Sequence, residues 1–433
     1  MPRVASFFVA AAVAVGGAAP ASAATWSPVA PVPAGAGAGT PAAAIAADGS
    51  EVLVFVDTGG VEATVRGPGE ATFRAPQTIA PPPVAGGAIR NLVVAQVPGA
   101  ETVALWSRAG PGAPERIEWA ARPPGGAFGS VHEVPRSGLP ADALTDMMSA
   151  AAGASGDLVL ALAAEGTEPD GRFALRVYAA VRPAGGEFGS PVVLGALNTS
   201  FPDVAVAPDG DAVVTWLEGG ATRPGAIRAS RRPPEGAFAP ATTLDRTSEP
   251  GLAQPFVASG AGGETVAMWY RRTGRTKRVY FAVRPAGGSR FEGVGVLGDA
   301  PTRRYVLAGG PRGDVAAVWD DAGASGPVLT VRRRAPGHGF AAPVRLSHQP
   351  SVRAIDGSIT GNGTLVAAWQ RLFASERRDL SVAGQSPSGR RTELVRLQPP
   401  ASSFGFSLAS GASGHALAAW TVPGSAPRFS ARG

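Results

Sequence analysis

The chain repeats one short pattern eight times, and this repeat constrains the fold more than any other feature of its 433 residues. Each copy has a Gly turn, a short run with high β-strand propensity, and a large apolar residue at the end. These end residues lie 50 to 56 positions apart and are Phe55, Trp106, Leu162, Trp216, Trp269, Trp319, Trp369 and Trp420. Periods of this length built from short strands are typical of propeller blades. No segment has the sustained 3.6-residue period of a helical solenoid.

A second repeated pattern, Arg-Pro-x-Gly-Gly-x-Phe, supports the same division of the chain. Its copies end at Phe128, Phe188, Phe238 and Phe291, with looser ones at Phe73 and Phe340. In the fourth repeat we therefore expect four strands, at 203–207, 212–216, 227–231 and 238–244. The turns between them contain the Pro, Gly and Asp residues that tight hairpins require. The Trp and Phe columns are expected to be core residues that pack adjacent blades together.

The two ends of the chain together supply the strands of one complete blade. The eighth repeat stops at Gly433 after three strands, and Trp26 to Val29 resembles the strand that is missing. We therefore predict an all-β, eight-bladed β-propeller of four-stranded blades, closed by the N-terminal strand, which completes the last blade. Seven blades with an irregular extra unit is the alternative. Residues 24–433 are expected to form this single domain.

Residues 1–23 have the features of a signal peptide: Arg3, an apolar stretch, and Ala21-Ser22-Ala23 as a cleavage site. We expect a secreted, monomeric protein without stable membrane insertion, since no later segment has 18 uninterrupted apolar residues. The chain has no Cys, which excludes disulfides. Its net charge of +6 comes mostly from isolated arginines, so no nucleic-acid partner is expected. The four histidines, His132, His338, His348 and His415, share no metal-binding spacing, so neither a metal nor a cofactor is expected.

The turn before each fourth strand resembles the Asp-box of sialidase-type propellers, Ser-x-Asp-x-Gly-x-Thr-Trp followed by Pro. In the third repeat Gly186, Phe188 and Pro191 match, but Val181 replaces the Ser and Pro183 replaces the Asp. The resemblance covers one hairpin in about six repeats and implies a propeller fold. The turn is structural in that family, and sialidases generally have six blades, so the resemblance implies no catalytic residue here.

We expect the functional face to be the one that holds the loops between blades and the loops between the second and third strands, because their lengths vary. Alignment of the repeats places Arg90, Asp203, Arg304, Tyr305 and Asp356 at the mouth of the central channel. The two arginines would hold a carboxylate or sulfate. The two aspartates would accept hydrogen bonds from hydroxyls, or one would act as a general acid or base. The alternative is that these charges pair with one another or stay solvated.

Residues 270–278 form the one concentrated basic run. Arg271 and Arg272 in this run, together with Arg303 and Arg304, are expected to form a positive sector that attracts an anionic polysaccharide or an acidic extracellular protein. The alternative is a solvated loop. The function predicted is therefore a secreted, non-catalytic binding or scaffold propeller for such a partner. The alternatives are a divergent sialidase-like glycoside hydrolase or lyase acting at the channel mouth, and a ring that mediates only protein contacts.

Overall fold

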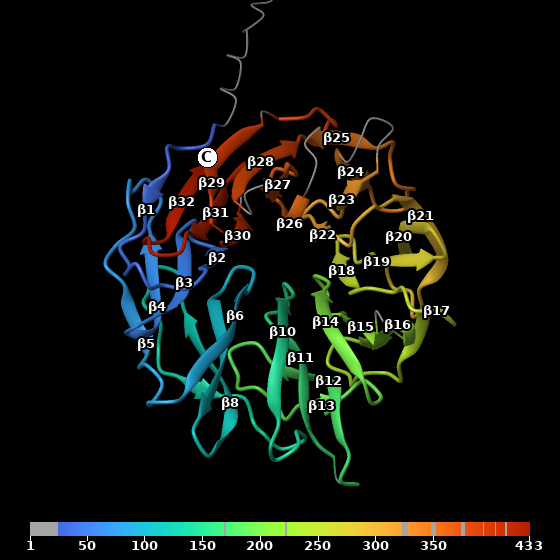
Figure 1. The fold of residues 1–433 in the computed structure, drawn as a ribbon, viewed down its shortest axis with the longest axis horizontal. Helices are drawn as coiled ribbons and strands as arrows, with labels where there is room; N and C mark the ends of the chain where they lie inside the picture. Colours follow the sequence, from blue (N-terminus) through green and yellow to red (C-terminus); the bar gives the residue numbers. More distant parts are fainter. Residues whose placement is uncertain are drawn as a thin grey trace, which may run out of the picture.

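The computed structural model describes residues 25–168, 170–220, 223–322, 328–347, 352–373, 377–392, 394–402, 404–411 and 414–433. These residues form eight four-stranded antiparallel sheets arranged in a ring, which confirms the eight-bladed β-propeller and excludes seven blades (Figure 1). No helix long and apolar enough to cross a membrane occurs among them. The predicted signal peptide, residues 1–23, lies outside the described residues.

Each blade begins with an inner strand that faces the middle of the ring (Figure 1). Its strands then follow outward in chain order, except that the outermost strand of blade 8 is β1. Blades 1 and 2 are β2 (Ala42–Ile45), β3 (Glu51–Asp57), β4 (Gly60–Arg66), β5 (Gln77–Ala80) and β6 (Ala88–Gln96), β7 (Thr102–Gly110), β8 (Ala113–Arg122), β9 (His132–Glu133). Blades 3 and 4 are β10 (Leu144–Ala152), β11 (Leu158–Thr167), β12 (Phe173–Arg182), β13 (Val192–Val193) and β14 (Thr199–Val206), β15 (Ala212–Gly220), β16 (Arg223–Arg232), β17 (Thr242–Thr247). Blades 5 and 6 are β18 (Phe256–Ser259), β19 (Thr265–Thr273), β20 (Thr276–Arg284), β21 (Glu292–Asp299) and β22 (Tyr305–Gly309), β23 (Val315–Asp321), β24 (Val328–Arg334), β25 (Val344–Ser347). Blades 7 and 8 are β26 (Val352–Ile359), β27 (Leu365–Leu372), β28 (Arg378–Gln385), β29 (Val395–Ala401) and β30 (Gly405–Ser410), β31 (Ala416–Thr421), β32 (Arg428–Arg432), β1 (Ala30–Pro31).

The N-terminal strand closes the ring, as predicted. Strand β1 pairs with β32, with Ala30 opposite Phe429, and an isolated bridge joins Trp26 to Arg432. The Ser27 amide also donates to the Ala431 carbonyl at 2.7 Å. The regular pairing thus begins just after the predicted segment, Trp26 to Val29, while the bridge lies within it.

The core lies between the blades. Side chains of the second strands fill each junction, and the six tryptophans of the repeat are at most 1% exposed. Trp216, for example, packs against Val159 and Ala161 of the preceding blade. Burial of such a ring removes roughly 150–250 Å² from water, and at about 25 cal/mol per Å² this stabilises the junction by up to roughly 4–6 kcal/mol. The prediction that the tryptophans are core residues is confirmed.

The phenylalanine column packs against the core but precedes the fourth strand and is not part of it. Its members are either buried (Phe73, Phe128 and Phe188) or half-buried (Phe238, Phe291 and Phe340). The fourth strand of blade 4 was expected to start at Phe238, whereas β17 starts at Thr242. The reason is local, since Pro240 has no amide hydrogen to donate to a neighbouring strand. Phe238 instead packs inward against the cluster between blades 3 and 4.

Arginine–carboxylate pairs join neighbouring blades. In blades 3 to 6 the last residue of the third strand is an arginine whose guanidinium reaches a carboxylate just before the second strand of the preceding blade. The pairs are Arg182–Glu101 at 2.5 Å, Arg232–Asp157 at 3.2 Å, Arg284–Asp211 at 2.7 Å and Arg334–Glu264 at 2.7 Å. We call these the inter-blade pairs. The arginine that begins the Arg-Pro turn is therefore a link between blades as well as a turn residue.

Arg284→Ala is expected to lower the free energy of unfolding by about 3–5 kcal/mol, because it leaves the Asp211 carboxylate buried without one of its two cationic partners. Arg278, on the same strand, supplies a matched control. Its pair with Asp299 is solvent-exposed, so Arg278→Ala should change stability little. Denaturant unfolding of both variants would measure the difference. Equal losses in the two would contradict a structural role for the inter-blade pairs.

Candidate functional site

A pocket of about 390 Å³ opens where blades 4 to 7 meet at the channel mouth. It is lined by Phe201, Leu217, Ala253, Gln254, Phe256, Arg303, Arg304, Tyr305, Ala354 and Ile355. We call it the mouth pocket. Of the residues predicted from sequence as a ligand site, it contains Arg303, Arg304 and Tyr305. Because the antiparallel order of each blade brings the loops between blades to one face, residues far apart in sequence converge here.

Tyr305 and Phe256 form a fixed aromatic wall. Their rings meet edge to face, with centroids 5.4 Å apart and planes at 90°. The Tyr305 hydroxyl donates to the Gln254 carbonyl and accepts from the Tyr270 amide at 3.2 Å. Burial raises the pKa of Tyr305 above its usual value. This phenol therefore stays neutral and holds the wall in place.

Phe201 enters the same pocket from a strained backbone position. Its φ is +53°, a region that bulky residues rarely adopt. A register shift between Ser200 and Asp203 surrounds it, so the start of β14 bulges. Strain of this kind persists where the surrounding structure enforces it, and it concentrates at functional sites.

The two pocket arginines are exposed. Arg303 lies over the ring of Tyr270, 5.6 Å from its centroid. The side chain of Arg304 is exposed overall, but partial desolvation of its guanidinium together with the nearby Arg353 and Arg378 lowers its pKa, and it remains a cation at neutral pH. No ion pair involves Arg303 or Arg304 among the described residues. Arg303 is, however, hydrogen-bonded to the Tyr270 side chain, and the nearby Asp320 carboxylate offsets part of the Arg304 charge. An anionic ligand would therefore meet two exposed guanidinium groups whose charge is only partly compensated.

The remaining predicted arginines lie outside the pocket. Arg271 pairs with Asp245 at 2.9 Å and stacks on Tyr280, so part of the predicted positive sector is neutralised. Arg272 is exposed on the same strand. Arg90 is exposed on β6 of blade 2, whereas the pocket residues come from blades 4 to 7. A binding role for these three arginines stays a prediction.

Asp203 and Asp356 occupy equivalent places in the inner strands of blades 4 and 7, and each is bonded to the next blade. Asp203 accepts from the Val257 amide at 2.8 Å and from the Ser149 hydroxyl at 2.9 Å. Asp356 accepts from the Leu408 amide at 2.9 Å. Burial raises the pKa of each carboxyl to about 6. They are perturbed carboxyls at the channel wall, but neither lines the mouth pocket.

The histidines are scattered. His415 contacts Glu51 at 2.7 Å, a carboxylate that Arg66 also binds, and His132 stacks on Trp119. His348 lies outside the described residues. In the described part of the chain, no cluster of three or more His, Cys, Asp or Glu side chains is placed to hold a metal ion.

Sequence reasoning missed Phe201, Leu217 and Gln254 as pocket residues. It also missed Phe256, which begins the inner strand of blade 5. The one available signal for Phe201 was its place before Pro202 at the end of a loop between blades, a position that disfavours helical backbone but does not indicate a positive φ. The bulge that turns this ring into the pocket is invisible in a repeat alignment.

No protein-family model matches the chain, and no curated protein matches it. Solved structures with some similarity include an α-L-arabinanase from Penicillium chrysogenum complexed with arabinobiose, at 13% identity and a TM-score of 0.41, over 66% of this chain and 92% of that one. The polysaccharide lyase Uly1 has 10% identity and a TM-score of 0.44, over 76% and 87%. The α-L-arabinofuranosidase Arb93A from Fusarium graminearum has 11% identity and a TM-score of 0.40, over 67% and 92%. This likeness is too distant to transfer any functional residue.

Ionisation of Asp356 is expected to make stability depend on pH. The unfolded carboxyl has a pKa near 3.8 and the folded one about 6, so the folded chain binds more protons between these values. The free energy of unfolding should therefore fall as pH rises from about 4 to about 6, by at most roughly 3 kcal/mol. Asp356→Asn should remove this part of the pH dependence. Unfolding curves of both proteins at pH 4, 5, 6 and 7 would test it, and parallel profiles would contradict it.

Proposed function

We propose that the mouth pocket binds a saccharide that carries a carboxylate or sulfate group. The observation that carries this proposal is the combination of Phe201 and Phe256 with the exposed cations Arg303 and Arg304 in one recess. Tyr305 is only 4% exposed and supports this wall by packing edge to face against Phe256. Aromatic faces offer apolar surface to the C–H side of a sugar ring. A guanidinium offers a planar pair of donors to an anionic group. A volume of about 390 Å³ accommodates one or two sugar units.

The place of action that we propose is outside the cell. Residues 1–23 carry the features of an export signal, and acidic polysaccharides are abundant extracellular polymers. The protein would act as a binding module in this setting, with the exposed Arg272 and Arg90 adding long-range attraction to the same polymer.

Binding is tested with the chain from residue 24 onward against polygalacturonate and alginate as acidic polymers and arabinan and starch as neutral ones. We expect capture of an acidic polymer that weakens between 20 and 300 mM salt, because exposed charges are screened. The variant R303A/R304A should lose at least about tenfold in affinity, since charge-assisted hydrogen bonds contribute roughly 1.5–3 kcal/mol each. Isothermal titration calorimetry measures the affinity.

The control variant removes two other exposed arginines, Arg290 and Arg345, that have no partner among the described residues and lie outside the pocket. R290A/R345A has the same net charge as R303A/R304A, so it should bind like the wild type if the pocket is the site. Equal weakening of both variants would mean that net charge alone attracts the polymer. A preference for neutral polymers, or no capture at all, would overturn the proposal.

One observation favours catalysis as a second candidate function. Asp203 and Asp356 lie at equivalent places on the inner strands of blades 4 and 7, and burial raises the pKa of each to about 6, a value suited to a general acid or base at neutral pH. Glycoside cleavage commonly uses two carboxyls. If this candidate holds, the wild type should release reducing ends from a bound acidic polymer, and Asp203→Asn should abolish release while leaving binding intact. Binding without release would exclude cleavage of that polymer and leave the binding module.

A further inference from the structure

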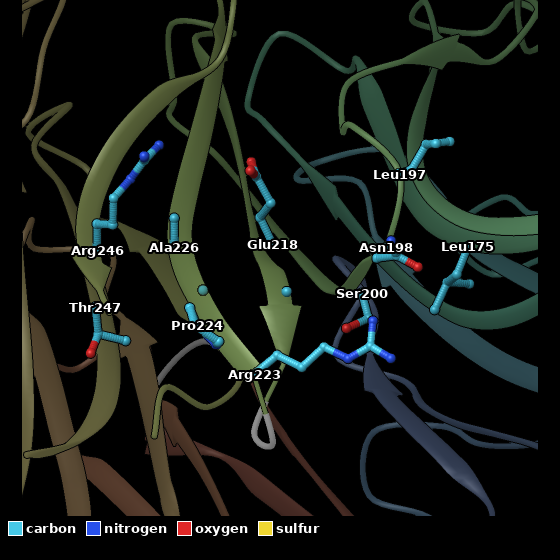
Figure 2. Close-up of a pocket in the computed structure, with 12 residues that line it drawn as sticks. Leu175, Leu197, Asn198, Ser200, Glu218, Arg223, Pro224, Ala226, Arg246 and Thr247 are labelled. Carbon is cyan, nitrogen blue, oxygen red and sulfur yellow. The ribbon is translucent and has the colours of Figure 1, made fainter. Parts of the chain in front are cut away.

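A second pocket, of about 650 Å³, lies between blades 3 and 4 on the outer side of the start of β14 (Figure 2). Blade 3 contributes Leu175, and the connection to blade 4 contributes Leu197 and Asn198. The rest of the lining comes from blade 4: Ser200, Glu218, Gly219, Arg223, Pro224, Gly225, Ala226, Arg246 and Thr247. We call it the blade 3/4 pocket. Nothing in the proposed function uses it.

The polar groups of the blade 3/4 pocket are mostly unused by the protein. Within the described part of the chain, the side chains of Asn198, Ser200, Arg223 and Arg246 form no hydrogen bond or ion pair, and Asn198 and both arginines are exposed. Figure 2 shows the Arg223 side chain extending toward Ser200 and Asn198. These side chains therefore supply free donors to a ligand rich in hydroxyl and anionic groups.

The charge of the pocket is positive. Its single carboxylate, Glu218, is already bound by Arg228 at 3.1 Å, which leaves the charges of Arg223 and Arg246 uncompensated. An anionic ligand is thus the complementary one. By contrast, the arginines of the inter-blade pairs are buried against carboxylates and have no charge to offer.

The blade 3/4 pocket and the mouth pocket share one wall. Ser200 lines the first and Phe201 the second, and on the adjacent strand Glu218 lines the first and Leu217 the second. Leu217 and Glu218 point to opposite sides as neighbouring strand residues do, and at Ser200 and Phe201 the bulge sets the two directions, so the wall is a single layer of backbone. Two residues of positive φ, Asn198 at +62° and Phe201 at +53°, set the path of the backbone in this wall. A hydrogen bond of 3.0 Å from the Gly219 amide to the Asn198 carbonyl joins it to the adjacent strand.

We propose that the blade 3/4 pocket is a second subsite for the saccharide of the mouth pocket, an inference that rests on the proposed function. The ligand is then an oligosaccharide with several anionic groups, which crosses the wall at Ser200 and Phe201. Arg303 and Arg304 hold one anionic unit, and Arg223 and Arg246 hold another a few units along the chain. Phe201 lies between the two subsites.

The test is the dependence of affinity on ligand length, measured by isothermal titration calorimetry with disaccharides and hexasaccharides of galacturonate and of alginate. For the wild type we expect at least tenfold tighter binding of the hexasaccharide of one of these series. The variant R223A/R246A should bind the disaccharide as the wild type does but lose this gain. R290A/R345A, with the same charge, should keep it. The substituted side chains are exposed, and thermal melting would confirm that all variants fold.

Each outcome separates the second subsite from the function proposed for the mouth pocket. If R223A/R246A binds the hexasaccharide as tightly as the wild type, the second subsite is overturned and the mouth pocket proposal stands. If the wild type binds the hexasaccharide no more tightly than the disaccharide, the second subsite is likewise overturned and the mouth pocket proposal stands. If R303A/R304A leaves disaccharide binding unchanged, the function proposed for the mouth pocket fails. If the wild type binds neither series, both proposals fail.

Discussion

The architecture depends on the contact between a buried guanidinium and a carboxylate of the preceding blade. Arg182 and Arg284 are at most 3% exposed, and a charge in such a place is tolerated only when its partner is present. Apolar burial of the tryptophans is non-directional, whereas a charge-assisted hydrogen bond fixes distance and angle. A bond of 2.7 Å between Arg284 and Asp211 allows one relative placement. The pairs thus fix the position of one sheet against the next, since within the described residues the strands of neighbouring blades do not pair with one another.

Where the third strand does not end in arginine, or no carboxylate faces it, other residues form the polar contact between blades. Blade 7 has Gln385 at the end of its third strand, and here Arg333 of blade 6 reaches across, with its guanidinium bonded to the Gln385 carbonyl and to the Asp314 carboxylate. At the closing junction, His415 of blade 8 contacts Glu51 of blade 1, which Arg66 also binds. The polar link between blades is kept in different chemical forms at these junctions.

Much of the fold could be predicted from the sequence because the fold repeats with a regular period. Much of the site could not be predicted, because its residues follow no period. The spacing of Trp216, Trp269 and the other strand ends determines the blade count, and the partial blades at the two ends predict the closure. The inter-blade pairs join residues 70 to 81 positions apart, so neither partner is recognisable within one repeat. The pockets depend on the bulge at Phe201, where a shift of one position reverses the direction of each side chain.

The pairing of Ala30 with Phe429 has a consequence for the order of folding. The first seven blades are each contiguous in sequence, so each can form its own hairpins as soon as its residues are available. The eighth receives its outermost strand from the opposite end of the chain, and the loop that must close is nearly the whole protein. We therefore expect docking of that short strand to be the final step, so that until then the growing arc would expose one unpaired edge at each end. A second incompletely folded chain could pair with those edges through the same contacts that close one ring. The misfolded product expected is therefore a dimer in which the N-terminal strand of one chain completes the last blade of the other.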